Sequence, residues 1–303
     1  MPLGLGTTMA SSDNVSTAVQ KNLAPADLFL NTYSGASVAY SFRKLDNSYS
    51  GNCIRVVNDS SVALDIGFDG SGYLDTSAIA THCGSGNGKM SIWYDQSGNS
   101  RNALADKSGN QPLIFSSGSM VEVNNKAAAL FDGGDRMVTG AFQAHTGSFY
   151  AVGVVQTPSS IGNENIFSQD DAQGTPQVRT AQYLRTASST SSGRVVVFNT
   201  SVSNFADPST SVSTSDQVML SSYATSGGVI ESFDNSATNG TSSYTGTLAT
   251  NNQVAAIGSN TGSVSPGAFF NGHIQEIVLW DGDQGSTTRS NIERDVNGYY
   301  IIF

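Results

Sequence analysis

The sequence predicts an all-β protein built of two antiparallel sheets packed face to face. Three observations support this fold class. More than ten short segments alternate apolar and polar residues, and Gly, Asn, Asp or Ser residues bound most of them. Charged residues make up 13% of the chain, about half of the roughly 25% typical of soluble domains, and small polar residues fill the gap. Few segments carry a helical pattern. Many short strands joined by turns are typical of a β-sandwich.

The predicted strands begin at residue 36. In ASVAYSFRKL, Val38, Tyr40 and Phe42 share one face. The pattern continues to about residue 282 without a linker-like break, so we expect one sandwich domain over residues 36–303. The other strand candidates are CIRVVN, KMSIWYD, QPLIFSS, AAALFDG, SFYAVGVVQTP, NIFSQD, VRTAQYLR, RVVVFN, QVMLSSYA, GVIESFD, QVAAIGS and FFNGHIQEIVLW.

Two segments of the predicted domain carry a helical pattern. LDTSAIATHC, residues 74–83, can be capped by Asp75 or Thr76. The closing segment STTRSNIERDVNGYY starts at Ser286, a plausible N-cap, and Gly298 should weaken or end the helix. We expect this last helix to pack across one end of the sandwich. Its predicted apolar face consists of Ile292, Val296 and Tyr299.

Residues 1–35 differ from the rest of the chain. They are small and polar, and one short helix is predicted before Pro25. The first residues lack the basic and apolar regions of a secretory signal, so we do not expect one. We predict an arm that serves attachment or assembly, and the alternative is a frayed terminus.

Charge and hydropathy narrow the classes of partner. The net charge is −10, from 14 Lys and Arg against 24 Asp and Glu, and an acidic surface repels nucleic-acid phosphates. No apolar run approaches the roughly 20 residues that cross a bilayer, so no membrane insertion is expected. Neutral ligands such as sugars, or protein partners, fit this composition better.

Three segments between residues 39 and 112 carry a family resemblance. AYSFRKLDNSYSGNCIRV, LDIGFDGSGYLDTSAIATHCGSGNG and IWYDQSGNSRNALADKSGNQP follow in the order of the α-L-arabinofuranosidase B catalytic-domain family, which the chain resembles. The match covers about residues 36–115, and YDQSGN is its most specific piece. AAIGSNTGSVSPGAFFNGHIQEIVLW is similar but looser. The resemblance implies a concanavalin A-like jelly-roll sandwich, related in architecture to laminin-G-like lectin domains. Such domains also occur as modules of tailed-phage virion proteins.

The catalytic carboxylates that this resemblance implies are replaced. Retaining glycoside hydrolysis needs a nucleophile and an acid/base about 5 Å apart. In the family the acid/base Asp follows an Ile-Gly-Gly turn, and Ile257-Gly258-Ser259-Asn260 matches it here, so Asn260 stands at the acid position. An amide does not donate a proton at neutral pH. The nucleophile region matches residues 194–205, which contain no Asp or Glu, and Asn199 lies nearest to the expected position. We therefore expect no hydrolysis.

The two cysteines, Cys53 and Cys83, are too few for a disulfide framework. A single bridge is open, but free buried thiols are favoured. The family pairs the cysteine that matches Cys83 with another five residues later, and Gly88 takes that place here.

The stretch YDQSGN allows two interpretations. Asp95 can accept backbone N–H bonds and Gly98 permits a positive φ, which indicates a structural corner. Alternatively, aromatic faces stack on sugars while amides bond their hydroxyls. Trp93 and Tyr94 point to opposite faces of their strand, so at most one of them lines a cleft. The full set of glycan-binding candidates is Trp93, Tyr94, Asp95, Gln96, Asn99, Asn199, Ser259 and Asn260.

No cofactor is expected, with calcium left open. The chain has three pairs of aspartates in turn-like stretches, where Asp commonly bonds its own backbone. None has the spacing of a dedicated calcium loop. The pairs are Asp132 with Asp135, Asp170 with Asp171, and Asp281 with Asp283.

Three functions remain in competition. The first is a non-enzymatic virion structural protein of a tailed phage: a decoration, fibre or adhesin protein. It would attach to other virion proteins through residues 1–35, bind host-surface polysaccharide, and form a homo-oligomer, with a trimer as the expected state. The second is an active arabinofuranosidase-like hydrolase acting on arabinose-containing polysaccharide. The third is a purely structural cement protein of a capsid or tail, without a ligand.

Overall fold

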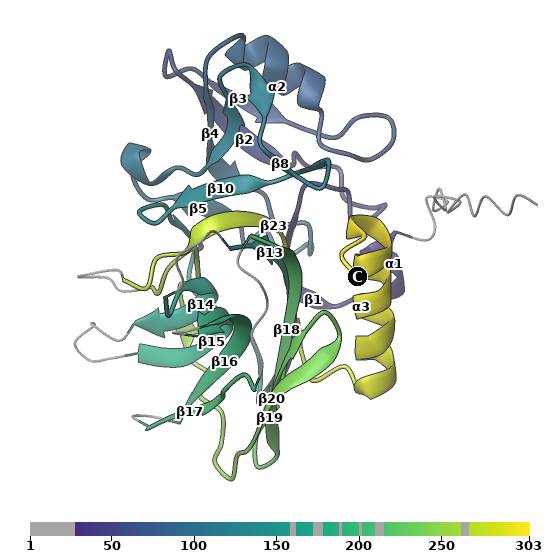
Figure 1. The fold of residues 1–303 in the computed structure, drawn as a ribbon, viewed down its shortest axis with the longest axis vertical. Coiled ribbons are helices and arrows are strands. Elements are labelled where there is room, and N and C mark those ends of the chain that lie inside the picture. Colours follow the sequence, from purple (N-terminus) through teal and green to yellow (C-terminus); the bar gives the residue numbers. More distant parts are fainter. Residues whose placement is uncertain are drawn as a thin grey trace, which may run out of the picture.

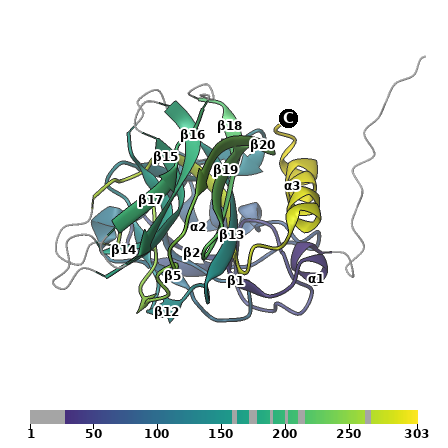
Figure 2. The same cartoon turned by 90° about the horizontal axis from the view of Figure 1, so that it is seen from below.

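A computed structural model describes residues 28–157, 162–171, 178–187, 190–199, 202–209, 215–261 and 267–303, without the side chains of residues 178, 190, 191, 199 and 202. Residues 1–27 of the predicted arm, including the predicted helix before Pro25, lie outside the described residues. The described chain forms two facing layers of antiparallel strands, with a helix on the outside of one layer (Figures 1 and 2).

The front layer is organised around β23 (Asn271–Asp281), the longest strand. On one edge β23 pairs with β13 (Ser148–Gln156), and the sheet continues through β18 (Gln217–Thr225), β19 (Val229–Asp234) and β20 (Ala237–Ser243). On the other edge it pairs with β1 (Ala36–Ser41) and β10 (Ala129–Asp132).

The strands beyond β10 form the upper part of Figure 1, where α2 (Thr76–Cys83) lies. They run through β6 (Leu113–Ser116), β4 (Gly88–Trp93) and β2 (Ile54–Asn58) to β3 (Ala63–Ile66). Asp75 caps α2 by accepting a hydrogen bond from the backbone N–H of Ala78, which confirms one of the two predicted caps. Smaller pieces are β7 (Ser119–Met120), the hairpin β8 (Glu122–Val123) with β9 (Lys126–Ala127), and a 3-10 turn at Ser108–Asn110.

The back layer starts where β5 (Ala103–Ala105) pairs with β4. It continues through β11 (Met137–Val138), β22 (Ala256–Ile257), β14 (Asn165–Asp171), β15 (Val178–Ala187), β16 (Thr190–Asn199) and β17 (Val202–Ala206). A two-stranded pair, β12 (Phe142–Gln143) with β21 (Asn252–Gln253), lies beside it. This architecture confirms the predicted all-β sandwich of concanavalin A-like type with a C-terminal helix.

The main hydrophobic core fills the space between the layers. The predicted inward face of β1 is confirmed, because Val38, Tyr40 and Phe42 all belong to this core. Trp93 stacks on Phe42 with ring centroids 4.7 Å apart. Cys53 and Cys83 are both free, as the sequence favours, although Cys83 is only half-buried.

The closing helix α3 (Ser286–Tyr300) departs from four expectations. It packs on the outer face of the front sheet, against Tyr150, Val278 and Trp280, and not across an end of the sandwich. Its N-cap is Gly285, with a positive φ of 67° and no side-chain cap. It runs through Gly298, because helical φ and ψ angles are open to glycine at a modest cost. Ile292 and Val296 are buried as predicted, but Tyr300 completes the buried face in place of the half-buried Tyr299.

The residues between α3 and the outer face of the front sheet form a second hydrophobic core, and part of the segment predicted as an arm belongs to it. In the short helix α1 (Phe29–Thr32), Phe29 and Leu30 are buried, and the indole N–H of Trp280 donates to the carbonyl oxygen of Tyr33 at 3.0 Å. Residues 29–33 are therefore anchored to the sandwich.

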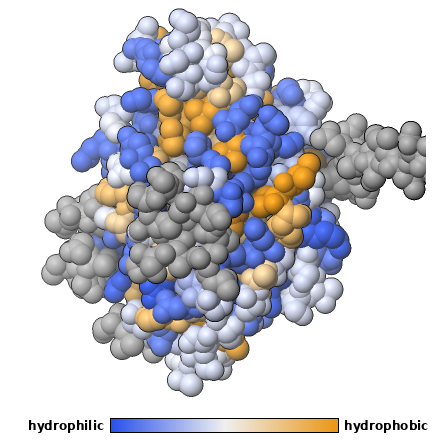
Figure 3. All heavy atoms as spheres, in the orientation of Figure 1, coloured by the Kyte–Doolittle hydropathy of each residue, from blue (hydrophilic) through white to orange (hydrophobic). Residues whose placement is uncertain are grey.

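The described surface is mostly hydrophilic on the side shown in Figure 3, with limited apolar patches. Across the described residues, the large apolar side chains that are exposed are scattered over several elements: Val62, Leu64, Tyr73, Leu104, Phe205, Val254, Ile301 and Phe303. Within the part of the chain that the structure describes, no helix is long and apolar enough to cross a membrane.

Candidate functional site

The YDQSGN loop runs along one edge of β1. Asp95 Oδ1 accepts from the backbone N–H of Ala39 at 2.9 Å, and the backbone N–H of Gln96 donates to the Ala39 carbonyl at 2.8 Å. Asn99 Nδ2 donates to the carbonyls of Ala36 and Ser37 at 3.0 and 3.1 Å. The loop therefore satisfies the backbone groups of β1 that β23 does not pair, and it protects an edge that would otherwise be open.

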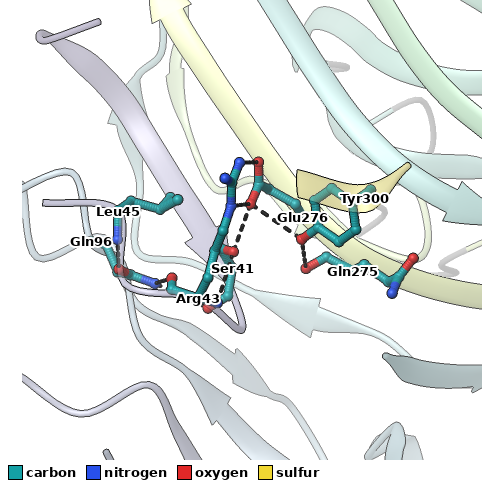
Figure 4. Close-up of polar contacts among 7 residues, drawn as sticks. All are labelled: Ser41, Arg43, Leu45, Gln96, Gln275, Glu276 and Tyr300. Carbon is teal, nitrogen blue, oxygen red and sulfur yellow. Dashed lines mark hydrogen bonds and ion pairs between the residues drawn. The ribbon is translucent and has the colours of Figure 1, made fainter. Parts of the chain in front are cut away.

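Gln96 extends this clamp beyond the end of β1 (Figure 4). Its Nε2 donates to the carbonyls of Ser41 and Arg43 at 3.0 Å each, and its Oε1 accepts from the backbone N–H of Leu45 at 2.8 Å. Arg43 donates to both oxygens of Glu276 on β23 at 2.8 Å. The loop is thereby joined, through Arg43, to a buried ion pair in the front sheet.

The same ion pair reaches the closing helix. Glu276 Oε2 also accepts from Ser41 Oγ at 2.7 Å and from the hydroxyl of Tyr300 at 3.2 Å (Figure 4). Burial and the Glu276 carboxylate raise the pKa of the Tyr300 hydroxyl well above its usual value, which keeps it a donor. Four sequence-distant segments thus meet in one hydrogen-bonded network.

Trp93 and Tyr94 do point to opposite faces. Trp93 is fully buried in the core, so its ring is not available to a ligand. Tyr94 is half-buried on the outer face, where its hydroxyl donates to Asp65 Oδ1 at 2.7 Å. With Asp95 and Gln96 also buried, the geometry supports the structural interpretation of this loop.

A polar hollow of about 240 Å³ lies beside the loop. Asp95, Gln96 and Gly98 contribute to its wall, together with Asp46 and Tyr49. Across the described residues, no group of three or more His, Cys, Asp or Glu side chains lies close enough to hold a metal ion. Calcium binding stays a prediction.

The predicted acid position lies in the back layer. Asn260 follows β22, and its Oδ1 accepts from the backbone N–H of Gly267 at 2.7 Å. The side-chain amide is therefore bonded to the backbone seven residues further along the chain. Ser259 is buried, and its hydroxyl donates to the Asn260 carbonyl. The backbone N–H of Thr261 donates to the carbonyl of Asp170 at 3.1 Å, which places Asn260 beside the end of β14.

The other predicted candidate, Asn199, ends β16, where its backbone pairs with Val202. Its side chain lies outside the described residues. Among the described side chains, no hydrogen bond, ion pair or ring contact joins the loop at residues 93–99 to Asn260, so these predicted candidates do not form one described site.

The side chains on the outer face of β14–β17 form a cluster that the sequence analysis missed. Cross-strand register places them on one face, opposite to the core-facing Ile166, Ala181 and Val197. We call this cluster the arginine face; it comprises Asp170, Arg179, Gln182, Arg185, Arg194, Phe198 and Phe205.

Two ion pairs organise the arginine face. Arg179 donates to both oxygens of the buried Asp170, at 2.6 and 3.2 Å, and Gln182 Nε2 donates to the same carboxylate. The Arg179 guanidinium lies 3.8 Å from the ring centroid of Phe198. Three of the roughly four acceptor sites of this carboxylate are thus occupied, two of them by a guanidinium group.

The second ion pair stands next to an exposed aromatic ring. Arg194 lies 2.9 Å from Asp207, and its guanidinium lies 4.1 Å from the ring centroid of Phe205, which is 40% exposed. The face thus presents one accessible ring, Phe205, beside the partly exposed guanidinium groups of Arg179 and Arg194, whereas Gln182 and Phe198 are buried. Aromatic rings and planar polar groups are the groups that contact sugars. The sequence signal for it is the two arginines in VRTAQYLR, but β-bulges in the β14–β15 ladder hide their shared face.

Comparisons by sequence identify no relative: no protein-family model and no curated protein matches the chain.

Comparisons by structure give clear matches. An arabinofuranosidase complexed with arabinofuranosyl-α-1,2-xylobiose superimposes with a TM-score of 0.62, and a GH54 α-L-arabinofuranosidase soaked with a cyclic sulfate inhibitor with 0.63. A variant of a GH54 α-L-arabinofuranosidase soaked with 4-nitrophenyl α-L-arabinofuranoside gives 0.64. In each case the identity is 14%, and the match covers 91% of this chain but 65% of the other. At this identity the likeness concerns the fold. The chain therefore has the concanavalin A-like β-sandwich fold found in GH54 α-L-arabinofuranosidase structures.

Proposed function

We propose that this chain binds a polysaccharide through its arginine face without cleaving it. One observation carries the proposal: Asp170, the buried carboxylate of this face, has both oxygens engaged by Arg179 and Gln182. The neighbouring position predicted for a catalytic acid holds Asn260, whose side-chain amide accepts from the backbone N–H of Gly267. Retaining hydrolysis needs one carboxylate free to attack and another free to exchange a proton.

The rest of the face supports binding. Phe205 presents an exposed ring beside the Arg194 guanidinium, and an aromatic face of this kind packs against the C–H surface of a sugar. The partly exposed guanidinium groups of Arg179 and Arg194 supply hydrogen-bond donors for hydroxyl oxygens. Two of the structurally similar proteins were studied with arabinofuranosyl ligands, which makes arabinose-containing glycans the first to test here.

The test combines a glycan array with a hydrolysis assay. We expect Phe205→Ala to weaken binding of the best glycan about tenfold, because stacking contributes about 1–1.5 kcal/mol. Leu104→Ala is the matched control, since Leu104 is similarly exposed on the distant strand β5. Thermal unfolding checks that both variants fold. Equal loss in both variants, or none in either, contradicts the proposed site.

Hydrolysis is measured with 4-nitrophenyl α-L-arabinofuranoside. We expect no release of nitrophenol above background. Release that Asp170→Asn abolishes would establish the competing hydrolase function and overturn the claim of binding without cleavage.

We further propose that the protein is carried on the virion of a tailed phage, with the part of residues 1–35 that precedes the anchored residues 29–33 contacting other virion proteins. The support is the sequence resemblance to phage-borne modules, and anchoring of residues 29–33 to the sandwich fits a segment that leads away from it. Mass spectrometry of purified virions tests the location, and failure to detect the chain there rejects it. An array without hits, combined with a large buried contact on a particle, would favour a cement protein.

A further inference from the structure

Arg185 stands apart from the other arginines of the arginine face. Arg179 is paired with Asp170 and Arg194 with Asp207. Arg185 Nη1 donates to the neutral side-chain oxygen Oε1 of Gln182 at 2.7 Å. Its Nε–H is buried and has no hydrogen-bond partner in the described part of the chain. Within the described ranges, the structure gives Arg185 no acidic partner of its own.

A second unpartnered group faces the same place. Asn165 on β14 lies directly opposite Arg185 on β15, and such cross-strand pairs project from the same face of a sheet. Its side chain is completely buried, yet neither its Nδ2 nor its Oδ1 has a hydrogen-bond partner in the described part of the chain. Buried polar atoms are paired in almost all native structures, so we expect a water or a ligand group to partner these two neighbours.

Electrostatics identify the partner's charge. Burial, followed by the nearby Arg194, lowers the pKa of the Arg185 guanidinium to about 10, so the group stays charged at neutral pH. Asp170 and Asp207 act on Arg185 in the opposite direction, but Asp170 is paired with Arg179 and Asp207 with Arg194, which leaves three arginines against two carboxylates. A bound anion would balance the remaining positive charge. Guanidinium groups form their strongest hydrogen bonds with carboxylate and with phosphate-like oxyanions.

We propose that the polysaccharide bound at the arginine face carries an acidic group, a carboxylate or a sulfate, which Arg185 receives with Asn165 as a neighbouring donor. This inference rests on the proposed polysaccharide binding and names the ligand class. Because the net charge of −10 repels an acidic polymer over the rest of the surface, binding of such a polymer should depend on Arg185.

The experiment uses polymer pairs that differ in charge alone. Polygalacturonate is compared with its methyl ester for the carboxylate, and dextran sulfate with dextran for the sulfate. For one pair at low salt, we expect the wild-type protein to bind the charged polymer about tenfold more tightly, a difference of about 1.4 kcal/mol, which a charge-assisted hydrogen bond can supply. The ratio should fall as sodium chloride is raised.

Arg185→Gln should abolish this ratio, and Arg185→Lys should retain part of it. The matched control is Arg55→Gln, which removes a half-exposed arginine of the other layer and should leave the ratio unchanged. We also expect Arg185→Gln to unfold at no lower temperature than the wild-type protein, because it removes an unpaired charge.

The outcomes separate the two proposals. A ratio that is absent in the wild-type protein, or that persists in Arg185→Gln, overturns the inference, whereas binding that still depends on Phe205 keeps the proposed function. If no polymer binds, the proposed function fails, and a small anion then tests whether Arg185 binds an acidic group. Sodium glucuronate should then raise the melting temperature of the wild-type protein, but not of Arg185→Gln, relative to glucose at matched ionic strength. Equal melting temperatures overturn the inference.

Discussion

Asp95, in the YDQSGN stretch, is a carboxylate whose acceptors serve the backbone. Its two oxygens accept from the backbone N–H groups of Ala39, Ser97 and Arg101 and from the Ser97 hydroxyl. Carboxylates and amides that bind sugars use the same atoms in the same way. The deciding fact is the unpaired edge of β1, which the local sequence does not reveal.

Replacing Asp95 tests the clamp. Asp95→Ala leaves buried N–H groups of Ala39 and Arg101 without an acceptor, and we expect the free energy of unfolding to fall by about 2–4 kcal/mol. Urea unfolding measures it. The control is Asp69→Ala, because Asp69 accepts similar backbone bonds in an exposed turn and should cost about 1 kcal/mol or less. Unchanged stability of Asp95→Ala, together with lost glycan binding, would instead make the loop a ligand contact.

At the scale of elements, the sequence predicted the strands that carry several large apolar residues, whether one face is buried, as in β19, or both, as in β13. It missed others for identifiable reasons. β20 consists of Ala, Thr, Asn, Gly and Ser residues, so it carries almost no apolar signal. β17 has the sequence VSNFA, whose two large apolar residues are separated by polar ones and follow closely on the strong VVVFN signal of β16. It was therefore not predicted as a separate strand. β5, β11 and β12 are two or three residues long, shorter than any periodic pattern.

The candidate site was predictable only in part. The Ile257–Asn260 match lies at the same end of the back layer as Asp170, because the backbone N–H of Thr261 donates to the Asp170 carbonyl. The arginine face was not predicted. Register shifts on both sides of Phe167 break the period of two, so that residues three apart, such as Gln182 and Arg185, share a face. Bulges of this kind depend on pairing with a distant strand, which a single segment does not encode.

The junction of α2 and β4 allows an engineered bond. A Cβ on Gly88 would lie 2.7 Å from Cys83 Sγ, within reach of an S–S bond of about 2 Å. We predict that Gly88→Cys forms a disulfide with Cys83 on oxidation, as the family resemblance implies for these positions. The short loop sets the gain over the reduced variant at about 2 kcal/mol.

Thiol titration in denaturant measures this bond. The oxidised variant should show only the Cys53 thiol, and reduction should restore the others. Gly109→Cys is the control, because a Cβ on Gly109 meets no atom within 4 Å and its thiol should stay free. An oxidised Gly88→Cys protein that keeps all its thiols would show that Val56, 2.9 Å from the same Cβ, prevents the bond.

On the scale of the whole molecule, one buried titratable side chain, His145, contacts strands of both layers. His145 is almost completely buried, and its ring lies 5.2 Å from that of Phe149 on β13 and 5.9 Å from that of Tyr183 on β15. Neither ring nitrogen has a hydrogen-bond partner among the described residues. Burial lowers the pKa of His145 to about 4, although the charge of Asp281 acts in the opposite direction. The sandwich therefore holds this buried histidine neutral.

This lowered pKa predicts acid sensitivity of the fold. The unfolded chain, with a histidine pKa of about 6.5, takes up the proton first, so stability is lost as pH falls from about 6.5 towards 4. The shift corresponds to about 2–3 kcal/mol at pH 4.5 relative to pH 7.5. His145→Phe keeps the aromatic packing and removes the titration, so the variant should gain that amount over the wild-type protein at pH 4.5 and much less at pH 7.5.

Urea unfolding at both pH values measures the difference between the two proteins, which isolates His145 from other titrating groups. That separation is needed because Asp135 acts in the opposite direction: burial raises its pKa to about 6, so its protonation favours the folded state as pH falls. Phe149→Leu is the packing control, since it disturbs the same contact without removing a titrating group and should cost similar stability at both pH values. If His145→Phe changes stability equally at pH 4.5 and 7.5, the histidine is charged or solvated in the folded protein, and the two layers do not exclude water at this point.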